Sequence, residues 1–88
     1  SDHGWGGNQF VLGGGVDGGK IYGSYPELAP AALEAARLNA GRLRVIPTTA
    51  VDQYFATLAS WMCVPDSELN TIFPNLKNFS TRNLGFLA

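Results

Sequence analysis

Glycine is distributed unevenly along this chain, and this feature limits most what the chain can fold into. Nine of the eleven glycines lie in residues 1–23, and none lies between Gly41 and Gly85. Glycine adopts backbone conformations that other residues avoid, and it weakens helices and strands. We therefore expect tight turns and close backbone approaches in the first segment, and ordinary helices in the remainder.

Three short apolar runs in the sequence predict β-strands. They cover residues 9–12, 20–22 and 43–46. The first is expected to be buried and to stop at the glycine triplet 13–15, and a turn is expected over 16–19. Together with the helices below, these runs predict an α/β fold.

Helices are expected near residues 49–63 and 67–73, with a further one over 31–38 that has Pro30 in its first turn. Thr48 or Thr49 can cap the helix near 49–63, and Asp52 lies three positions after Thr49, as in a capping box. Apolar residues recur at helical spacing in this helix and predict a face that packs into the core. They are Val51, Tyr54, Phe55, Leu58, Trp61 and Met62.

The tail after this helical region is expected to be irregular from Asn75 to Ala88. It carries four apolar residues that can anchor it: Phe79, Leu84, Phe86 and Leu87.

The composition favours a chain that is covered by other protein. Its 88 residues form one small unit, and 15% of them are charged, against about 25% in ordinary soluble domains. We expect the partner to be the remainder of the same protein or another subunit, a second copy included. The net charge of -1 and the lack of a basic run argue against nucleic acid. No apolar run approaches the roughly 20 residues that span a bilayer, so no membrane span is expected.

Two phosphate-binding patterns occur in the glycine-rich segment, and neither has the context that it needs. Gly13-x-Gly15-x-x-Gly18 matches the dinucleotide fingerprint, but a strand-like run follows it where a helix is required. Gly14-x4-Gly19-Lys20 resembles a Walker loop, but Ile21 stands where a hydroxyl should hold magnesium. No cofactor-binding residue is predicted from either pattern.

No side chain stands out as a catalytic nucleophile. Cys63 is the only cysteine, which excludes an internal disulfide, and its apolar surroundings predict a buried, inert thiol. No serine lies in a nucleophile-elbow pattern. The sequence therefore predicts no catalytic residue within the chain.

Asp2 and His3 are the residues whose chemistry points to a metal. A carboxylate and an imidazole on adjacent residues can reach one divalent ion, or two neighbouring ions, if Gly4 allows a sharp turn. The alternative is a frayed polar terminus, because His3 is the only histidine and no histidine cluster can form. The chain starts with Ser1 instead of methionine, so we expect the natural protein to begin earlier.

Five stretches of the chain resemble one bacterial protein family. They are DHGWGGNQFVLGG at residues 2–14, GGKIYG at 18–23, IPTTAVDQY at 46–54, and IFPNL at 72–76 together with LGF at 84–86. In this order they resemble the C-terminal end of the family known as domain of unknown function 1501. That family is a sulfatase-like branch of the alkaline phosphatase superfamily.

The resemblance implies a metal-dependent phosphoric- or sulfuric-ester hydrolase whose active site is incomplete here. It implies that the chain is the C-terminal piece of a larger α/β sandwich, with Asp2 and His3 as ligands of zinc, manganese, calcium or magnesium in the intact protein. A further histidine often follows this pair in the superfamily, and Asn8 and Gln9 stand nearby instead. It also implies export from the cytoplasm. The alternative hypothesis is a non-catalytic, extracytoplasmic structural or assembly module.

Overall fold

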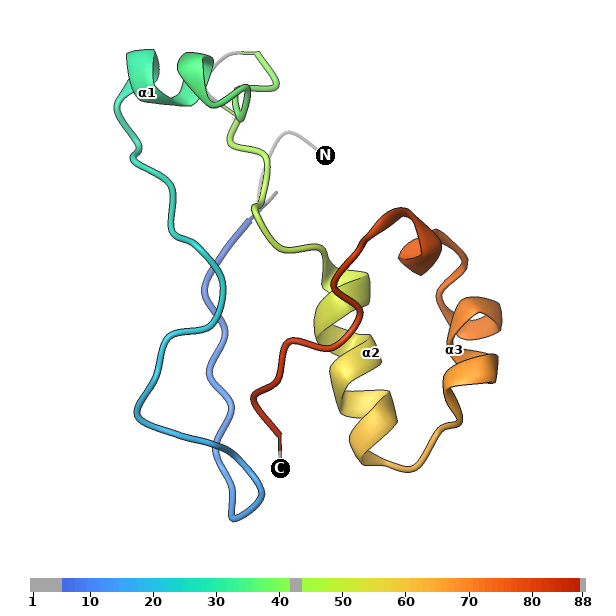
Figure 1. The fold of residues 1–88 in the computed structure, drawn as a ribbon. Helices are drawn as coiled ribbons and strands as arrows, with labels where there is room; N and C mark the ends of the chain where they lie inside the picture. Colours follow the sequence, from blue (N-terminus) through green and yellow to red (C-terminus); the bar gives the residue numbers. More distant parts are fainter. Residues whose placement is uncertain (1–5, 42–43, 88) are drawn as a thin grey trace. The chain divides into compact units, whose positions relative to one another are not determined.

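The computed structural model describes residues 6–41 and 44–87, which contain short helices joined by long irregular segments (Figure 1). In chain order the helices are α1 (Pro30–Ala35), α2 (Val51–Trp61), α3 (Asp66–Ile72) and a 3₁₀ helix, η1 (Pro74–Asn78). The chain divides into two compact units. The first contains the described residues up to Phe10 and the segment Ser24–Thr48, and the second contains Val11–Gly23 and the chain from Thr49 onward.

The predicted α/β sandwich is wrong for the part of the chain that is described. Those residues contain no sheet, only two isolated antiparallel bridges, Val16 with Leu87 and Asn39 with Val45. Residues 9–12 and 20–22 form no strand, and in the run 43–46 the described residues contribute Val45 alone to a bridge. A strand needs a partner that takes up its backbone hydrogen bonds, and propensity alone does not supply one.

Helix α1 is shorter than predicted because the backbone turns left-handed soon after it. Arg37 has φ 58°, and its N–H donates to Glu34 O while Leu38 N–H donates to Leu33 O. These two bonds form a Schellman motif, which satisfies the last carbonyls and ends the helix. Leu33 is the buried residue of α1.

Helix α2 is present where a helix was predicted, but its cap differs from the predicted one. The helix begins after Ala50, not at Thr48 or Thr49. Gln53 Oε1 accepts a hydrogen bond from Ala50 N–H at 2.8 Å. Alanine has no side-chain acceptor to return this bond, so half of a capping box is formed, by Gln53 in place of Asp52.

A second Schellman motif ends α2 and explains why the prediction for Cys63 is wrong. Cys63 has φ 68°, its N–H donates to Ser60 O, and Val64 N–H donates to Ala59 O. The residue at this left-handed position points away from the helix, and Cys63 is exposed, not buried. Val64 instead turns inward and joins the core.

The core of the second unit lies between α2, α3 and η1, with α2 and α3 side by side (Figure 1). Ala56, Leu69 and Leu76 are buried in it, and Ala59, Val64 and Phe73 pack against them. Helix α3 is the helix predicted near 67–73, and Pro74 follows it directly because proline fits the first turn of η1 but not a helix interior.

The apolar face of α2 does not point into this core, contrary to the prediction. Val51, Phe55, Trp61 and Met62 are exposed, and the buried residues of α2 are Gln53, Ala56 and Thr57. Small and polar residues therefore form the most buried side of the helix, its inner face. Of the predicted apolar face, Tyr54 and Leu58 are half-buried, and the other four residues form an exposed outer face. No helix in the described part of the chain is long and apolar enough to cross a bilayer.

The large apolar residues on the outer face of α2 are exposed, whereas the core residues are buried. Truncating one side chain from each group should therefore have unequal effects on the free energy of unfolding of the second unit. Leu76→Ala should lower the free energy of unfolding by about 2–5 kcal/mol, because Leu76 is 0% exposed and its removal leaves a cavity. Met62→Ala should change it by no more than about 0.5 kcal/mol, because Met62 is 72% exposed. Urea unfolding followed by circular dichroism measures both, and equal losses would contradict the described core.

Candidate functional site

The predicted metal ligands, Asp2 and His3, lie outside the residues that the structure describes. Residues 6–41 and 44–87 contain no group of three or more histidine, cysteine, aspartate or glutamate side chains that could hold a metal. The metal site therefore stays a prediction from the sequence.

Asp17, Lys20 and Tyr22 form the one polar cluster in the described glycine-rich segment. Lys20 Nζ contacts Asp17 Oδ2 at 2.7 Å, and both side chains are about half exposed. The Tyr22 hydroxyl donates a hydrogen bond to the Asp17 carbonyl at 2.7 Å. Lys20, the lysine of the Walker-like pattern, is thus paired with a carboxylate in its own loop. An exposed pair of this kind contributes little to stability.

Three aromatic rings connect this loop to α2 and to the C-terminal tail. The Phe86 ring lies 5.8 Å from Tyr22 and 5.7 Å from Tyr54, measured between centroids. Phe86 is 4% exposed, so it is a buried anchor, as the sequence predicted for the tail. The Tyr22 ring meets it edge to face, a favourable arrangement for aromatic pairs.

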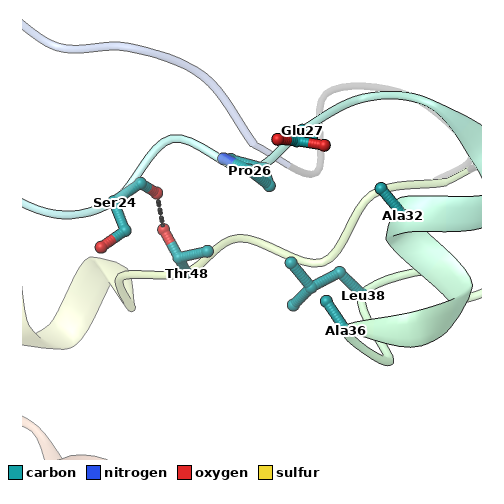
Figure 2. A pocket seen from close by; sticks show the side chains of 7 residues that line it. All are labelled: Ser24, Pro26, Glu27, Ala32, Ala36, Leu38 and Thr48. Atoms are coloured by element: carbon teal, nitrogen blue, oxygen red, sulfur yellow. Dashed lines mark hydrogen bonds between the residues drawn. The ribbon is translucent and has the colours of Figure 1, made fainter.

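A hollow of about 350 Å³ lies within the first unit (Figure 2). Its lining comes from α1 and from the chain on either side of it: Ser24, Pro26, Glu27, Ala32, Ala36, Leu38 and Thr48. The Thr48 hydroxyl donates a hydrogen bond to the Ser24 carbonyl, drawn as a dashed line in Figure 2, and joins the segments before and after α1.

The chemistry of this hollow suits contact with an apolar group better than catalysis. Most of its lining is aliphatic, and Glu27 is the one acidic or basic side chain in it. Nucleophilic catalysis requires a nucleophile beside a base, and no such pair lines the hollow. A second hollow, of about 170 Å³ beside Trp61 and Asn83, is smaller than the roughly 300 Å³ at which ligand pockets begin.

The exposed apolar side chains are the most unusual feature of the described surface. Phe10, Leu12 and Ile21 are 91%, 92% and 92% exposed, although the sequence predicted that residues 9–12 would be a buried strand. Tyr25 and Leu28 add to them before α1, and the outer face of α2 adds four more residues. Within each unit, large apolar side chains exposed in this way are typical of surface that contacts other protein.

Gln53 and Thr57 are two buried residues that the apolar pattern of α2 did not predict. Both are buried and polar, and they lie four residues apart, on one face of the helix. A signal was present in the sequence, because α2 carries a single charged residue, Asp52, and its polar positions are opposite the apolar stripe. A binary pattern assigns such positions to solvent, and here they face inward.

Comparison with models of known protein families finds no match for this chain, and comparisons with curated proteins and with solved structures find none either. The resemblance described above therefore rests on the quoted residues alone.

The surroundings of Tyr22 predict a phenol that titrates above its usual range. The pKa of the Tyr22 phenol is raised above 10.0, first by loss of contact with water and then by the charge of Asp17, with Lys20 opposing. A raised pKa in the folded state means that ionisation of Tyr22 is less favourable in the folded loop, so stability is full below pH 10 and falls as the pH rises through the folded pKa.

Spectrophotometric titration should show one tyrosine that ionises above its ordinary range, and Tyr22→Phe should remove that transition. If Tyr22→Phe instead removes a tyrosine whose titration midpoint is ordinary, the contact of Tyr22 with Asp17 is contradicted.

Proposed function

We propose that this chain is the C-terminal part of a larger metal-dependent phosphoric- or sulfuric-ester hydrolase, and that it is inactive by itself. One observation supports the proposal that the chain is part of a larger protein. Its described residues expose eleven large apolar side chains and bury only five hydrophobic residues. Single exposed apolar residues are ordinary, but a surplus of this kind indicates surface that another protein segment covers.

The remainder of the same protein is the partner that best fits this surface. Burying an exposed side chain such as Phe10, Leu12 or Ile21 contributes about 1.5–3 kcal/mol. Association of separate chains first costs several kcal/mol of translational and rotational freedom, which a covalently attached partner largely avoids. Docking within one chain therefore requires fewer contacts than docking between subunits.

The chemical class rests on Asp2 and His3 and on the family resemblance. One carboxylate and one imidazole suit zinc or manganese, and the carboxylate alone also suits calcium or magnesium. Two ligands do not complete a tetrahedral site, so the others would come from the remainder of the protein. When bound, the ion would stabilise negative charge on a phosphoryl or sulfuryl oxygen. The same resemblance supports an extracytoplasmic location.

The first test is metal binding by the intact natural protein. Asp2→Ala should weaken zinc or manganese binding by at least about tenfold, measured by isothermal titration calorimetry, because it removes a direct ligand. Asp66→Ala is the matched control: its side chain is 80% exposed and it should leave the affinity unchanged. An intact protein that binds no divalent metal, or an Asp2→Ala variant with the affinity of the natural protein, would refute the hydrolase proposal.

A non-catalytic structural or assembly module is the second candidate function. The outer apolar face of α2 favours it, because Val51, Phe55 and Met62 offer a docking surface that needs no metal. Such a module would dock against other protein, as in the first candidate function, but it would catalyse no ester hydrolysis. An intact protein that holds its C-terminal part firmly but hydrolyses neither aryl phosphates nor aryl sulfates with added metal would support the second candidate.

Docking predicts opposite effects of one double substitution in two contexts. Phe10→Ser with Leu12→Ser should reduce aggregation of the isolated 88-residue chain, because it removes exposed apolar surface. The same change should lower the melting temperature of the intact protein, where these side chains would be buried. Lys77→Ser, a change at an exposed polar position, should affect neither. An intact protein with an unchanged melting temperature would show that Phe10 and Leu12 do not dock.

A further inference from the structure

The inner face of α2 binds the backbone of the C-terminal tail through two polar side chains. Gln53 Nε2 donates a hydrogen bond to the Thr81 carbonyl at 2.7 Å, and Thr57 Oγ1 accepts one from Leu84 N–H at 2.9 Å. The Thr57 hydroxyl in turn donates to the Gln53 carbonyl at 2.8 Å. An irregular segment that packs on a helix must find partners for its backbone groups, and these side chains provide them.

The end of the same tail holds the glycine-rich loop, residues 13–23. Asp17 N–H donates a hydrogen bond to the Phe86 carbonyl at 2.9 Å, and Val16 pairs with Leu87 in an antiparallel bridge. The Phe86 ring contacts Tyr22 of the loop and Tyr54 of α2. The tail therefore connects the loop to the helix through both its backbone and its buried ring.

The loop has few other means of holding its conformation. Its described internal bonds are local: Val16 N–H to Gly13 O, the ion pair of Asp17 with Lys20, and the Tyr22 hydroxyl to Asp17 O. Glycine-rich backbone loses more entropy on ordering than other sequences do, so local bonds of this kind are a weak restraint. The tail supplies the described long-range backbone hydrogen bond of the loop and a buried ring, while Gly15 and Gly23 also lie close to Trp61 and Thr49.

The helical core, in contrast, contains no residue of the tail. Ala56, Leu69 and Leu76 form it, with Ala59, Val64 and Phe73 packed around them, and all six lie before residue 79. Releasing the tail would therefore leave these contacts in place. Proteins commonly open in such separate cooperative parts.

We propose that residues 79–87 act as a strap, which docks on Gln53 and Thr57 of α2 and is anchored by Phe86. The docked strap orders the glycine-rich loop. Its release frees the loop while the helices stay folded. Order of the loop thus depends on the far end of the chain. A partner that captured the tail would change the loop without contacting it. This device is independent of the metal proposal, because neither Asp2 nor His3 takes part in it.

Hydrogen exchange read by mass spectrometry on the 88-residue chain tests the strap. Phe86→Ala should make the hydrogen-bonded amides of the loop, those of Val16 and Asp17, exchange at least about tenfold faster, and amides of residues 55–76 should keep their protection. Ile72→Ala is the matched control: Ile72 is apolar and 53% exposed, and its truncation should alter neither region. Unchanged exchange of the Val16 and Asp17 amides in Phe86→Ala would overturn the proposal.

A milder variant decides the outcome if Phe86→Ala unfolds the helices as well. Thr57→Val keeps the shape of the side chain but removes the acceptor of Leu84 N–H. Faster exchange confined to the loop in this variant supports the strap, and either unchanged loop exchange or simultaneous loss in loop and helices overturns it.

A disulfide supplies the converse experiment. With Cys63→Ser, Val16→Cys and Leu87→Cys combined, a bond across the antiparallel bridge should restore loop protection to the Phe86→Ala variant when oxidised, because bridged residues lie within disulfide reach. Oxidation that leaves loop exchange fast would also count against the strap.

Discussion

The hydrogen bonds from the inner face of α2 are the contacts that hold the tail and, through the tail, the glycine-rich loop of the second unit. The tail packs without forming a helix or strand, so its partly buried backbone groups need side-chain partners. Gln53 and Thr57 are those partners, and they can act only if that face of α2 points inward. The large apolar residues on the opposite side then point outward. One requirement, satisfaction of partly buried backbone groups, explains both the buried polar pair and the exposed apolar face.

The exposed apolar residues give the functional proposal its physical basis. Phe10, Leu12 and Ile21 are almost fully exposed, and the core of the second unit is small. A chain of this length buries only about 60% of the surface that it exposes when unfolded, so its margin of stability is narrow. Contact with further protein would raise that margin. The proposed hydrolase class would add chemistry through the two predicted ligands, Asp2 and His3, and two ligands fit a part of a site better than a whole one.

Much of the helical structure follows from local signals in the sequence. Pro30, Pro65 and Pro74 stand at helix starts in the structure, as fixed φ angles and missing N–H groups require. Phe86 was predicted as an anchor because it is the kind of large apolar residue that docks a tail. The predicted strands at 9–12 and 20–22 failed for the opposite reason. A strand is stabilised by its neighbour, and no local pattern reveals whether a neighbour is present.

The candidate site, too, could be predicted from the sequence only in part. From the sequence came Asp2 and His3, as a pair of donor atoms whose spacing is local, and the positions of the helices, which depend on propensity and on proline. Tertiary structure alone decided which face of α2 is buried, because the hydrogen-bonding needs of a tail about 30 residues further along outweigh a hydrophobic stripe. It also decided that Cys63 is exposed, since the left-handed turn that ends α2 directs Val64 inward in its place.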